Sequence, residues 1–482
     1  MQVKDGYRHN FQEYPPKQDG TRKKTGSPPS STVPASGEPP KLLHKSLCPP
    51  CIVCVHIHFD TTSRPIYLKK GQVSHAAADA CSYYTSAWLI GGGPSQMDYP
   101  DFLQRLHEGI SEPSGSGRNK QIITFDKPHQ YRECLSYLRK LKPELAGLRQ
   151  VQPARLIRAL IAPLSGGDRL GKYHNGVTVE EDTRMKVHAE TAHIPKAEKN
   201  LSMPWGVKQV RAYKAWPSST GNRVRIGVID TGADFQHPDL RHSLARGINL
   251  LNRTMLPYDD NGHGTHIAGT IAASNYDEGM VGVAPRALIH PVKAFDHNGA
   301  AYVSDIILGI DWCVLNRVDI INMSFGMKSR SKALLDMVNK AYHNGIVVVA
   351  SSGNEGKRRS IDYPARYSQT ISVGATDKYR RIAPFSNRGQ FVDVYAPGEK
   401  ITSSWIHGKH HEMSGTSMAT SHVTGSIALL LSLRPELGPG EIKALLKRTA
   451  TPLRLRKSAG RSSISTKLGE VDAFRLMQEG TK

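Results

Sequence analysis

Three short segments of this chain carry side chains that together could perform acyl transfer. They are Val228-Ile229-Asp230-Thr231-Gly232, Asn261-Gly262-His263-Gly264-Thr265-His266 and Ser414-Gly415-Thr416-Ser417-Met418-Ala419. A serine hydroxyl is a weak nucleophile at neutral pH, so it needs a base to take its proton and an acid to orient that base. The segments supply one residue of each kind, in the chain order Asp, His, Ser.

Each of these residues also has an ordinary structural interpretation. Asp230 follows an apolar stretch and could cap a turn, and Ser417 could be the N-cap of a helix. His263 and His266 are spaced like a pair of metal ligands, but no Glu or third ligand accompanies them. A helix beginning at Ser417 would also serve catalysis, because its free N–H groups and positive dipole end favour a developing oxyanion.

A fourth residue, Asn354, completes the chemistry that these segments suggest. It lies in Ser351-Ser352-Gly353-Asn354-Glu355-Gly356, where its amide N–H₂ could donate a hydrogen bond to the oxyanion. Asparagine beside glycine is also common simply because it tolerates a left-handed backbone.

Between about residues 201 and 455, apolar strands alternate with helical stretches. We predict strands over residues 224–229, 289–294, 319–323, 346–350 and 371–373, and helices over 265–273, 303–316, 331–344 and 417–433. This alternation predicts an α/β fold, a mostly parallel sheet with helices on both faces. Asp230 would then lie at the carboxyl end of a strand, where catalytic residues of such folds gather.

The joint occurrence of these motifs, in this order, resembles the subtilisin-like serine proteases (peptidase S8 family). The resemblance covers about residues 203–453, and its first motif looks most like intracellular bacterial subtilisins. It is carried further by Met203-Pro204-Trp205-Gly206-Val207, Gly282-Val283-Ala284-Pro285, Ile321-Asn322-Met323-Ser324-Phe325-Gly326 and Tyr395-Ala396-Pro397-Gly398.

The resemblance implies a role for each site residue. Ser417 would attack the scissile carbonyl, His263 would take and return the proton, and Asp230 would hold the imidazole. Asn354 and the Ser417 backbone N–H would bind the oxyanion.

The resemblance also places the substrate and its primary pocket. An extended substrate would add a strand along Ser324, Phe325 and Gly326. The pocket would lie between that segment and Ser351, Ser352 and Gly353. Neither stretch holds an acidic residue, so we expect broad specificity with an apolar or aromatic preference.

Two departures from the family pattern stand out. Ala419-Thr420-Ser421-His422 has serine where the family usually has proline, which restores a backbone donor in the helix. Asp239 matches a calcium ligand of many subtilisins, whereas the loop over residues 274–279 matches their binding loop poorly. Asp277 and Glu278 could supply hard oxygens to a structural calcium, and no cofactor is needed for the chemistry itself.

Residues 97–190 are expected to form a separate small α+β domain. Apolar patterns predict a helix from about residue 98, a strand over 121–125, a helix over 130–141 and strands near 156–161 and 177–182. Its place before the protease domain and its closing Val-x-Glu-Glu-Asp resemble the inhibitory propeptides of subtilisins; the alternative is an unrelated interaction domain. The resemblance implies a partner in cis, cut off between about His188 and Ser202, with residues 191–200 as an exposed linker.

The two ends of the chain look different from the folded parts. Residues 1–96 are rich in Pro, Gly, Ser and Lys and read as disordered or as a non-native extension, with Met97 as an alternative start. Within them, Cys48, Cys51, Cys54 and His56 could bind zinc, or could be an unstructured segment that contains cysteine. Residues 456–482 read as a basic tail.

Composition limits the partners that we expect. The 482 residues carry a formal net charge of +22, but the excess is spread along the chain, so no specific nucleic-acid site is predicted. No stretch is long and apolar enough for a membrane span. No secretory leader is visible, which favours a cytoplasmic location; leaderless export or a misassigned start would make it extracellular.

These patterns lead to one expected function and one alternative. The expected function is a serine endopeptidase, made as an autoprocessed precursor, that acts on proteins or peptides. The alternative is a catalytically inactive homologue that serves as a binding protein. Covalent labelling of Ser417 by a fluorophosphonate would distinguish the two.

Overall fold

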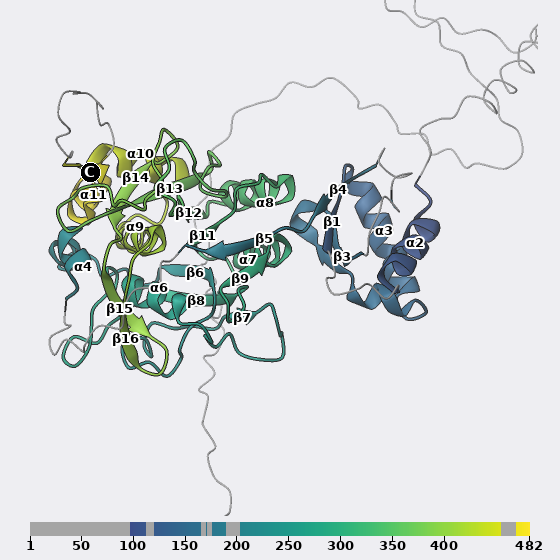
Figure 1. The fold of residues 1–482 in the computed structure, drawn as a ribbon, viewed down its shortest axis with the longest axis horizontal. Helices are drawn as coiled ribbons and strands as arrows, with labels where there is room; N and C mark the ends of the chain where they lie inside the picture. Colours follow the sequence, from purple (N-terminus) through teal and green to yellow (C-terminus); the bar gives the residue numbers. More distant parts are fainter. Residues whose placement is uncertain (1–96, 112–119, 165–169, 171–175, 189–202, 455–468) are drawn as a thin grey trace, which may run out of the picture. The chain divides into compact units, whose positions relative to one another are not determined.

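The computed structural model of the chain describes residues 97–111, 120–164, 170, 176–188, 203–454 and 469–482 (Figure 1). The expectations for residues 1–96, their cysteine cluster, the linker over 191–200 and residues 456–468 lie outside the described residues. We call residues 97–188 the small domain and residues 203–482 the catalytic domain.

The catalytic domain is built on a nine-stranded sheet. Its strand order is β17-β18-β14-β13-β12-β10-β6-β8-β7, with every neighbouring pair parallel except β17 and β18. The strands are β6 (Arg225–Asp230), β7 (Ile248–Asn249), β8 (Leu288–Lys293), β10 (Ile320–Met323), β12 (Val347–Ser351), β13 (Thr370–Thr376), β14 (Val394–Pro397), β17 (Thr451–Pro452) and β18 (Gly469–Glu470). The predicted mostly parallel sheet is confirmed.

Helices cover both faces of this sheet, as predicted for this fold class. On one face α6 (His263–Ala272) and α9 (Thr416–Leu431) pack against each other and against the central strands; on the other lie α7 (Val303–Leu315) and α8 (Lys332–His343). The remaining helices are α4 (Trp205–Gln209), α5 (Ala212–Ala215), α10 (Pro439–Thr449) and α11 (Ala473–Gly480).

Successive residues of the central strands face opposite cores. In β12, Val347 and Val349 pack with α6 and α9, whereas Val348 and Ala350 pack with α7 and α8. A strand buried on both faces must be apolar at every position, which explains the uninterrupted valine run.

The small domain is an antiparallel sheet with the order β2-β3-β1-β4. Its strands are β1 (Lys120–Phe125), β2 (Gln152–Ala154), β3 (Ala159–Pro163) and β4 (Val177–Glu181). Helices α2 (Tyr99–Ser111) and α3 (Pro128–Leu141) cover one face of this sheet, where Ile123 and Phe125 are buried. Ile122 points to the opposite face, which packs against α7 and α8.

Two smaller sheets complete the fold. Strand β5 (Arg184–Val187) lies between β9 (Ala300–Tyr302) and β11 (Phe325–Gly326), antiparallel to both (Figure 1). Strands β15 (Ile401–Trp405) and β16 (Lys409–Met413) form a hairpin that leads to α9.

The structure differs from the expectations in two places. The predicted strand near 156–161 is only partly confirmed. Residues 155–157 form a 3₁₀ helix, η2, and Arg158 has a φ of 56° before β3 begins. A second 3₁₀ helix, η1 (Ala146–Gln150), precedes it in the chain. Residues 469–482 are not a tail: β18 pairs with β14, and α11 packs on α9. These elements were missed because they are two and eight residues long, too short for a periodic signal.

Candidate functional site

The candidate site lies where three neighbouring strands of the large sheet end. Met323 of β10 pairs with Ile229 of β6 and with Ala350 of β12. The next residue of each strand is therefore placed at one carboxyl edge: Asp230, Ser324 and Ser351. Helices α6 and α9, whose first turns carry His263 and Ser417, pack against each other at this edge.

Asp230 and His263 form a buried pair. His263 Nδ1 lies 2.7 Å from Asp230 Oδ1, and both side chains are almost completely buried. The carboxylate accepts from Nδ1–H, which leaves the lone pair on Nε2. Among the described residues, this Nε2 has no hydrogen-bond partner, so it is free to accept a proton.

The glycine before His263 allows this helix start. Gly262 has a φ of 109°, and a Cβ there would lie 2.3 Å from the ring of Trp405. Only glycine fits such a backbone without strain.

The hydroxyl of Ser417 lies among backbone carbonyls. Its Oγ is 2.7 Å from the carbonyl oxygen of His188 and 2.8 Å from that of Ser324. Since a hydroxyl has one proton, it donates to one of these acceptors at a time. Ser417 Oγ makes no hydrogen bond to Nε2 of His263 in this structure, so the hydroxyl must move from these carbonyls before the base can take its proton.

Asn354 is held with its amide N–H₂ available. Its Oδ1 accepts from the backbone N–H of Thr416 at 3.0 Å and from the Thr416 hydroxyl at 2.8 Å. The Ser417 N–H lies in the first turn of α9, where N–H groups lack an intrahelical acceptor. Two donors are thus present for an oxyanion at Ser417.

A segment of the small domain occupies the predicted substrate edge. Val187 pairs with Phe325 and Lys186 with Gly326, and the His188 N–H donates to the Ser324 carbonyl at 3.1 Å. On the other side, β5 pairs with β9. The segment therefore lies in the extended conformation that a protease binds.

The side chain of His188 fills the predicted primary pocket. Its Nδ1 lies 2.7 Å from Ser351 Oγ, and its Nε2 lies 3.1 Å from Asp362 Oδ2. A Cβ on Gly326 would approach the imidazole to 2.5 Å, so a residue without a side chain is needed there. Ser352 is buried beside the pocket, and its backbone N–H donates to the carbonyl of Val373.

An acidic residue was missed in this pocket. Asp362 is 2% exposed; its Oδ1 pairs with Lys328 Nζ at 2.5 Å, and Lys328 also pairs with Glu355. A Cβ on Gly353 would lie 2.8 Å from Asp362. The expectation of an apolar or aromatic preference considered only two chain segments, whereas Asp362 comes from a third and places a carboxylate beside the ring of His188. No local motif around Asp362 would have identified it.

The remaining histidines near the site have structural partners. His266 Nε2 is hydrogen-bonded to the carbonyls of Ile401 and His411, and complete burial lowers its pKa to about 3. The pKa of His422 falls to about 4 for the same reason. Ser421 donates its hydroxyl to the Ser417 carbonyl at 3.0 Å within an unbroken α9.

Asp239, the proposed calcium ligand, has nitrogen-rich surroundings. Its Oδ1 accepts from Asn275 Nδ2 at 3.1 Å, and its Oδ2 lies 3.2 Å from Ser404 Oγ and 2.6 Å from His410 Nε2. Among the described residues, the ligating group around Asp239 comprises His237 and His410, and neither Asp277 nor Glu278. Calcium prefers six to eight oxygens, so this donor set does not fit it.

No helix in the described ranges is long and apolar enough to cross a membrane.

Comparisons with known proteins agree with this geometry. Residues 221–470 match the model of the subtilase family, peptidase S8. Subtilisin E of Bacillus subtilis (strain 168) is 42% identical over 271 residues, which are 55% of this chain and 70% of that protein. Subtilisin of Bacillus pumilus is 43% identical over 257 residues, 52% of this chain and 93% of that protein.

A third relative shares a smaller part of its length. The minor extracellular protease Epr of Bacillus subtilis (strain 168) is 43% identical over 232 residues, 48% of this chain and 36% of that protein. With a family model that spans half of its length and such relatives, this chain belongs to the subtilase family and is a serine endopeptidase.

Proposed function

We propose that this chain is a protease precursor that cuts itself after His188, with Ser417 as nucleophile, His263 as base, Asp230 as its orienting acid and Asn354 as oxyanion donor. The observation that carries the proposal is the position of the His188 carbonyl oxygen, 2.7 Å from Ser417 Oγ at the end of an antiparallel substrate-like strand.

The proposed reaction follows from the arrangement of these groups. Ser417 Oγ bonds to the carbonyl carbon of His188 while His263 Nε2 takes the hydroxyl proton. Asn354 Nδ2 and the Ser417 N–H stabilise the oxyanion. The C–N bond to the next residue then breaks, His263 protonates the leaving amine, and water attacks the acyl-enzyme to release a carboxylate on His188.

The same contacts explain how the small domain would inhibit the enzyme. After cleavage, β5 keeps its pairing with β9 and β11, and His188 keeps its pocket. The cleaved domain would therefore remain a competitive occupant of the cleft until it dissociates or is degraded.

Self-processing can be tested on the full chain. We expect the purified wild-type protein to yield a product whose first residue is Ala189, as read by N-terminal sequencing and intact mass. The Ser417→Ala chain should stay uncut, and a fluorophosphonate should label Ser417 only in the wild-type protein. Equal processing of both chains, or a cut elsewhere, would contradict the proposal.

We also infer that the primary pocket prefers an imidazole or a cationic side chain. The two carboxylates of Asp362 and Glu355 face one ammonium group, Lys328, which leaves a net negative charge beside the ring of His188. Pairing through the backbone of β9 and β11 leaves the other positions permissive, so broad specificity stays part of the proposal.

Peptides that differ only at the cleaved residue would measure this preference. We expect a higher kcat/KM for histidine or arginine than for phenylalanine, because a buried polar group left unpaired by phenylalanine costs free energy. Asp362→Asn should reduce the ratio of kcat/KM for histidine to that for phenylalanine by about tenfold or more. Asp336→Asn, which removes a carboxylate that pairs with Lys332 on α8, should leave this ratio unchanged. A ratio unaffected by Asp362→Asn would exclude this pocket model.

The cytoplasmic location stays a prediction. Structural calcium at Asp239 is not part of the proposal, because the donors around this carboxylate include nitrogen atoms that calcium does not favour.

A further inference from the structure

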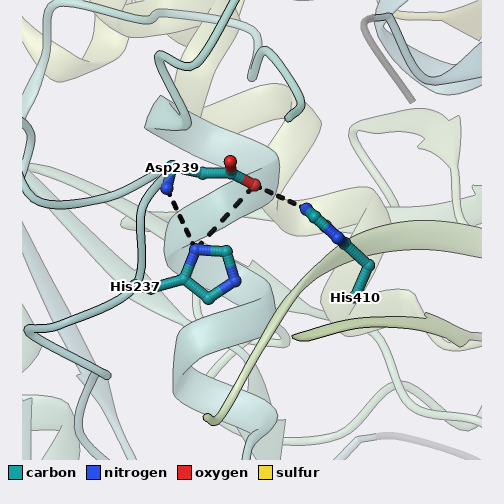
Figure 2. A group of neighbouring side chains, drawn as sticks. All are labelled: His237, Asp239 and His410. Atoms are coloured by element: carbon teal, nitrogen blue, oxygen red, sulfur yellow. Dashed lines mark hydrogen bonds and ion pairs between the residues drawn. The ribbon is translucent and has the colours of Figure 1, made fainter. Parts of the chain in front are cut away.

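We propose that His237, Asp239 and His410 form a binding site for a divalent transition metal of the zinc class. Each residue offers one ligand atom, and the three atoms all lie within 4.8 Å of one another (Figure 2). Among the residues that the structure describes, no other group of three His, Cys, Asp or Glu side chains meets this condition. The proposal is independent of the self-processing reaction.

The site joins two distant parts of the catalytic domain. His237 and Asp239 lie in the segment that follows β6, and His410 lies on β16 of the hairpin. Figure 2 shows the three side chains pointing toward one another from these two segments. The side chains of His237 and Asp239 are completely buried, whereas that of His410 is 21% exposed. An ion could therefore enter from the side of His410.

His237 is held in the tautomer that binds metals. Its Nε2 lies 2.8 Å from the Lys409 carbonyl, so Nε2 carries the proton, and Nδ1 accepts from the Asp239 N–H at 3.1 Å. An imidazole whose second nitrogen donates to a carbonyl is the usual arrangement of a metal-binding histidine. With one nitrogen donating and the other accepting, the ring is neutral.

The lone pair of His237 faces a carboxylate. Its Nδ1 lies 3.8 Å from Asp239 Oδ2, and both atoms are electron-rich. The Asp239 N–H donates to the one lone pair of Nδ1, and a cation between Nδ1 and Oδ2 would replace this hydrogen bond and stabilise both acceptors. Asn275 and Ser404 hold the carboxylate in this orientation.

His410 supplies the third ligand after losing one proton. Its Nε2 lies 2.6 Å from Asp239 Oδ2, a contact that contains a proton. On metal binding, that proton moves to Nδ1 if the ring is neutral, or leaves to solvent if it is an imidazolium. The carboxylate accepts from Asn275, Ser404 and His410, so both of its oxygens already face donors.

The donor set selects the kind of metal. Two imidazole nitrogens and one carboxylate oxygen suit zinc and its neighbours in the first transition row. Ligand atoms around tetrahedral zinc lie about 3.4 Å apart, given bonds of about 2.0–2.1 Å. The 3.8 Å separation of His237 Nδ1 and Asp239 Oδ2 must therefore shorten, and the 2.6 Å contact of Asp239 Oδ2 with His410 Nε2 must lengthen. The partly exposed His410, on a two-stranded hairpin, is the ligand with room to move. A water molecule would take the fourth position.

A metal here would connect the segment after Asp230 to the strand that leads to Ser417. Strand β16 ends at Met413, four residues before the nucleophile, and Trp405 of the same hairpin packs against His266. The ion would thus stabilise the hairpin in place rather than take part in the chemistry.

The test uses the full chain with Ser417→Ala, which prevents self-cleavage. Because residues 1–96 contain another set of possible zinc ligands, Cys48, Cys51 and Cys54 are also changed to serine. This parent protein is incubated with ZnCl₂ and desalted, and its metal content is measured by plasma mass spectrometry. Titration calorimetry with ZnCl₂ and with CaCl₂ gives the affinity for each ion.

We expect a single high-affinity zinc that is lost or bound at least about tenfold more weakly after His410→Gln. His411→Gln is the matched control, because His411 stands next on the same strand but packs against Trp405. Zinc should raise the Tm of the parent and of His411→Gln, and leave that of His410→Gln unchanged. Bound Co²⁺ should show the intense visible bands of a tetrahedral site in the parent.

Either of two results would overturn the proposal. One is equal zinc affinity in the parent and in His410→Gln. The other is tight calcium binding with no zinc binding at this site. His410 is near the surface, so its variant should fold; circular dichroism of His410→Gln verifies this, and His237→Gln then repeats the test at a buried ligand.

Discussion

The Ser417 hydroxyl lies between two carbonyl oxygens while the nearby base, His263 Nε2, has no hydrogen-bond partner among the described residues. Proton transfer to His263 therefore requires the Ser417 hydroxyl to leave its carbonyl acceptor and approach the imidazole. This movement would have to precede the proposed attack on the His188 carbonyl.

Asn354 is the proposed side-chain donor to the oxyanion. Replacing it by alanine removes the side-chain donor to the oxyanion, while the Ser417 N–H remains. We expect kcat to fall by about 10²–10³ with little change in KM, the magnitude known from the equivalent asparagine of a subtilisin rather than one derived from this chain.

Steady-state kinetics on a peptide substrate would measure the effect of Asn354→Ala. Asn316→Ala, at the exposed end of α7, is the control and should leave kcat unchanged. A kcat within about threefold of wild type would remove Asn354 from the site.

The small domain supplies carboxylates to the N-termini of two helices of the catalytic domain, α7 and α8. Glu180 accepts from the Ser331 hydroxyl at 2.9 Å and from the N–H groups of Lys332 and Ala333, both at 3.0 Å. Asp182 Oδ1 accepts from the Ser304 N–H at 2.8 Å. These first-turn N–H groups have no partner within α7 or α8. The two caps fix the segment that carries β5 into the cleft.

Asp182 makes the stability of this arrangement depend on pH. Burial raises its pKa to about 6, because the Ser304 hydrogen bonds and Lys120 only partly offset the loss of solvation. The folded state thus favours the protonated Asp182. The free energy of unfolding of the chain therefore falls as pH rises from about 4 through 6. A shift of about two pKa units corresponds to about 3 kcal/mol at most.

Asp182→Asn removes this titration and keeps an oxygen that can cap α7. Both proteins carry Ser417→Ala to prevent cleavage. We expect the Tm of the Asp182→Asn variant minus the Tm of its Ser417→Ala parent to increase from pH 4 to pH 7. Thermal unfolding at several pH values would check this. A constant difference in Tm would show that Asp182 is ionised equally in the folded and unfolded chains.

At the scale of the whole molecule, the core against α7 and α8 is shared between the two domains. Ile122, Ala154 and Ile157 of the small domain are buried in the same cluster as Met337 and Val338 of α8. The sheet of the catalytic domain pairs strands that are far apart in sequence. Such folds lose the entropy of closing long loops before the strand contacts compensate for it, so they fold slowly. A ready apolar surface from the small domain would assist that step.

Ile157 tests this shared core. Ile157→Ala should weaken the association of the small domain by about 2–4 kcal/mol, because it leaves a cavity at a site that is 3% exposed. In the Ser417→Ala chain, calorimetry should show an earlier unfolding transition of the small domain. Leu315→Ala, 69% exposed on α7, should have no such effect. Identical thermograms would mean that η2 contributes nothing to this contact.

The residues that carry the chemistry and the strands of the sheet could be predicted from the amino-acid sequence. Asp230, His263, Ser417 and Asn354 are local motifs whose residue types state their chemistry, and the alternation of apolar strands and helices appears within windows of five to fifteen residues. The strand runs at 347–350 and 320–323 and the helices α6 to α9 were predictable because they depend on neighbours in the chain.

The residues that fill and surround the cleft could not be predicted from the sequence, because they come from distant segments that meet on folding. His188 in the pocket, Asp362 and Lys328 beneath it, and the His237, Asp239 and His410 group bring together residues from separate segments. No local pattern records such meetings, since they follow from strand order and helix packing. The partners of a side chain depend on long-range packing, whereas its chemical reactivity depends on its residue type, which the sequence gives directly.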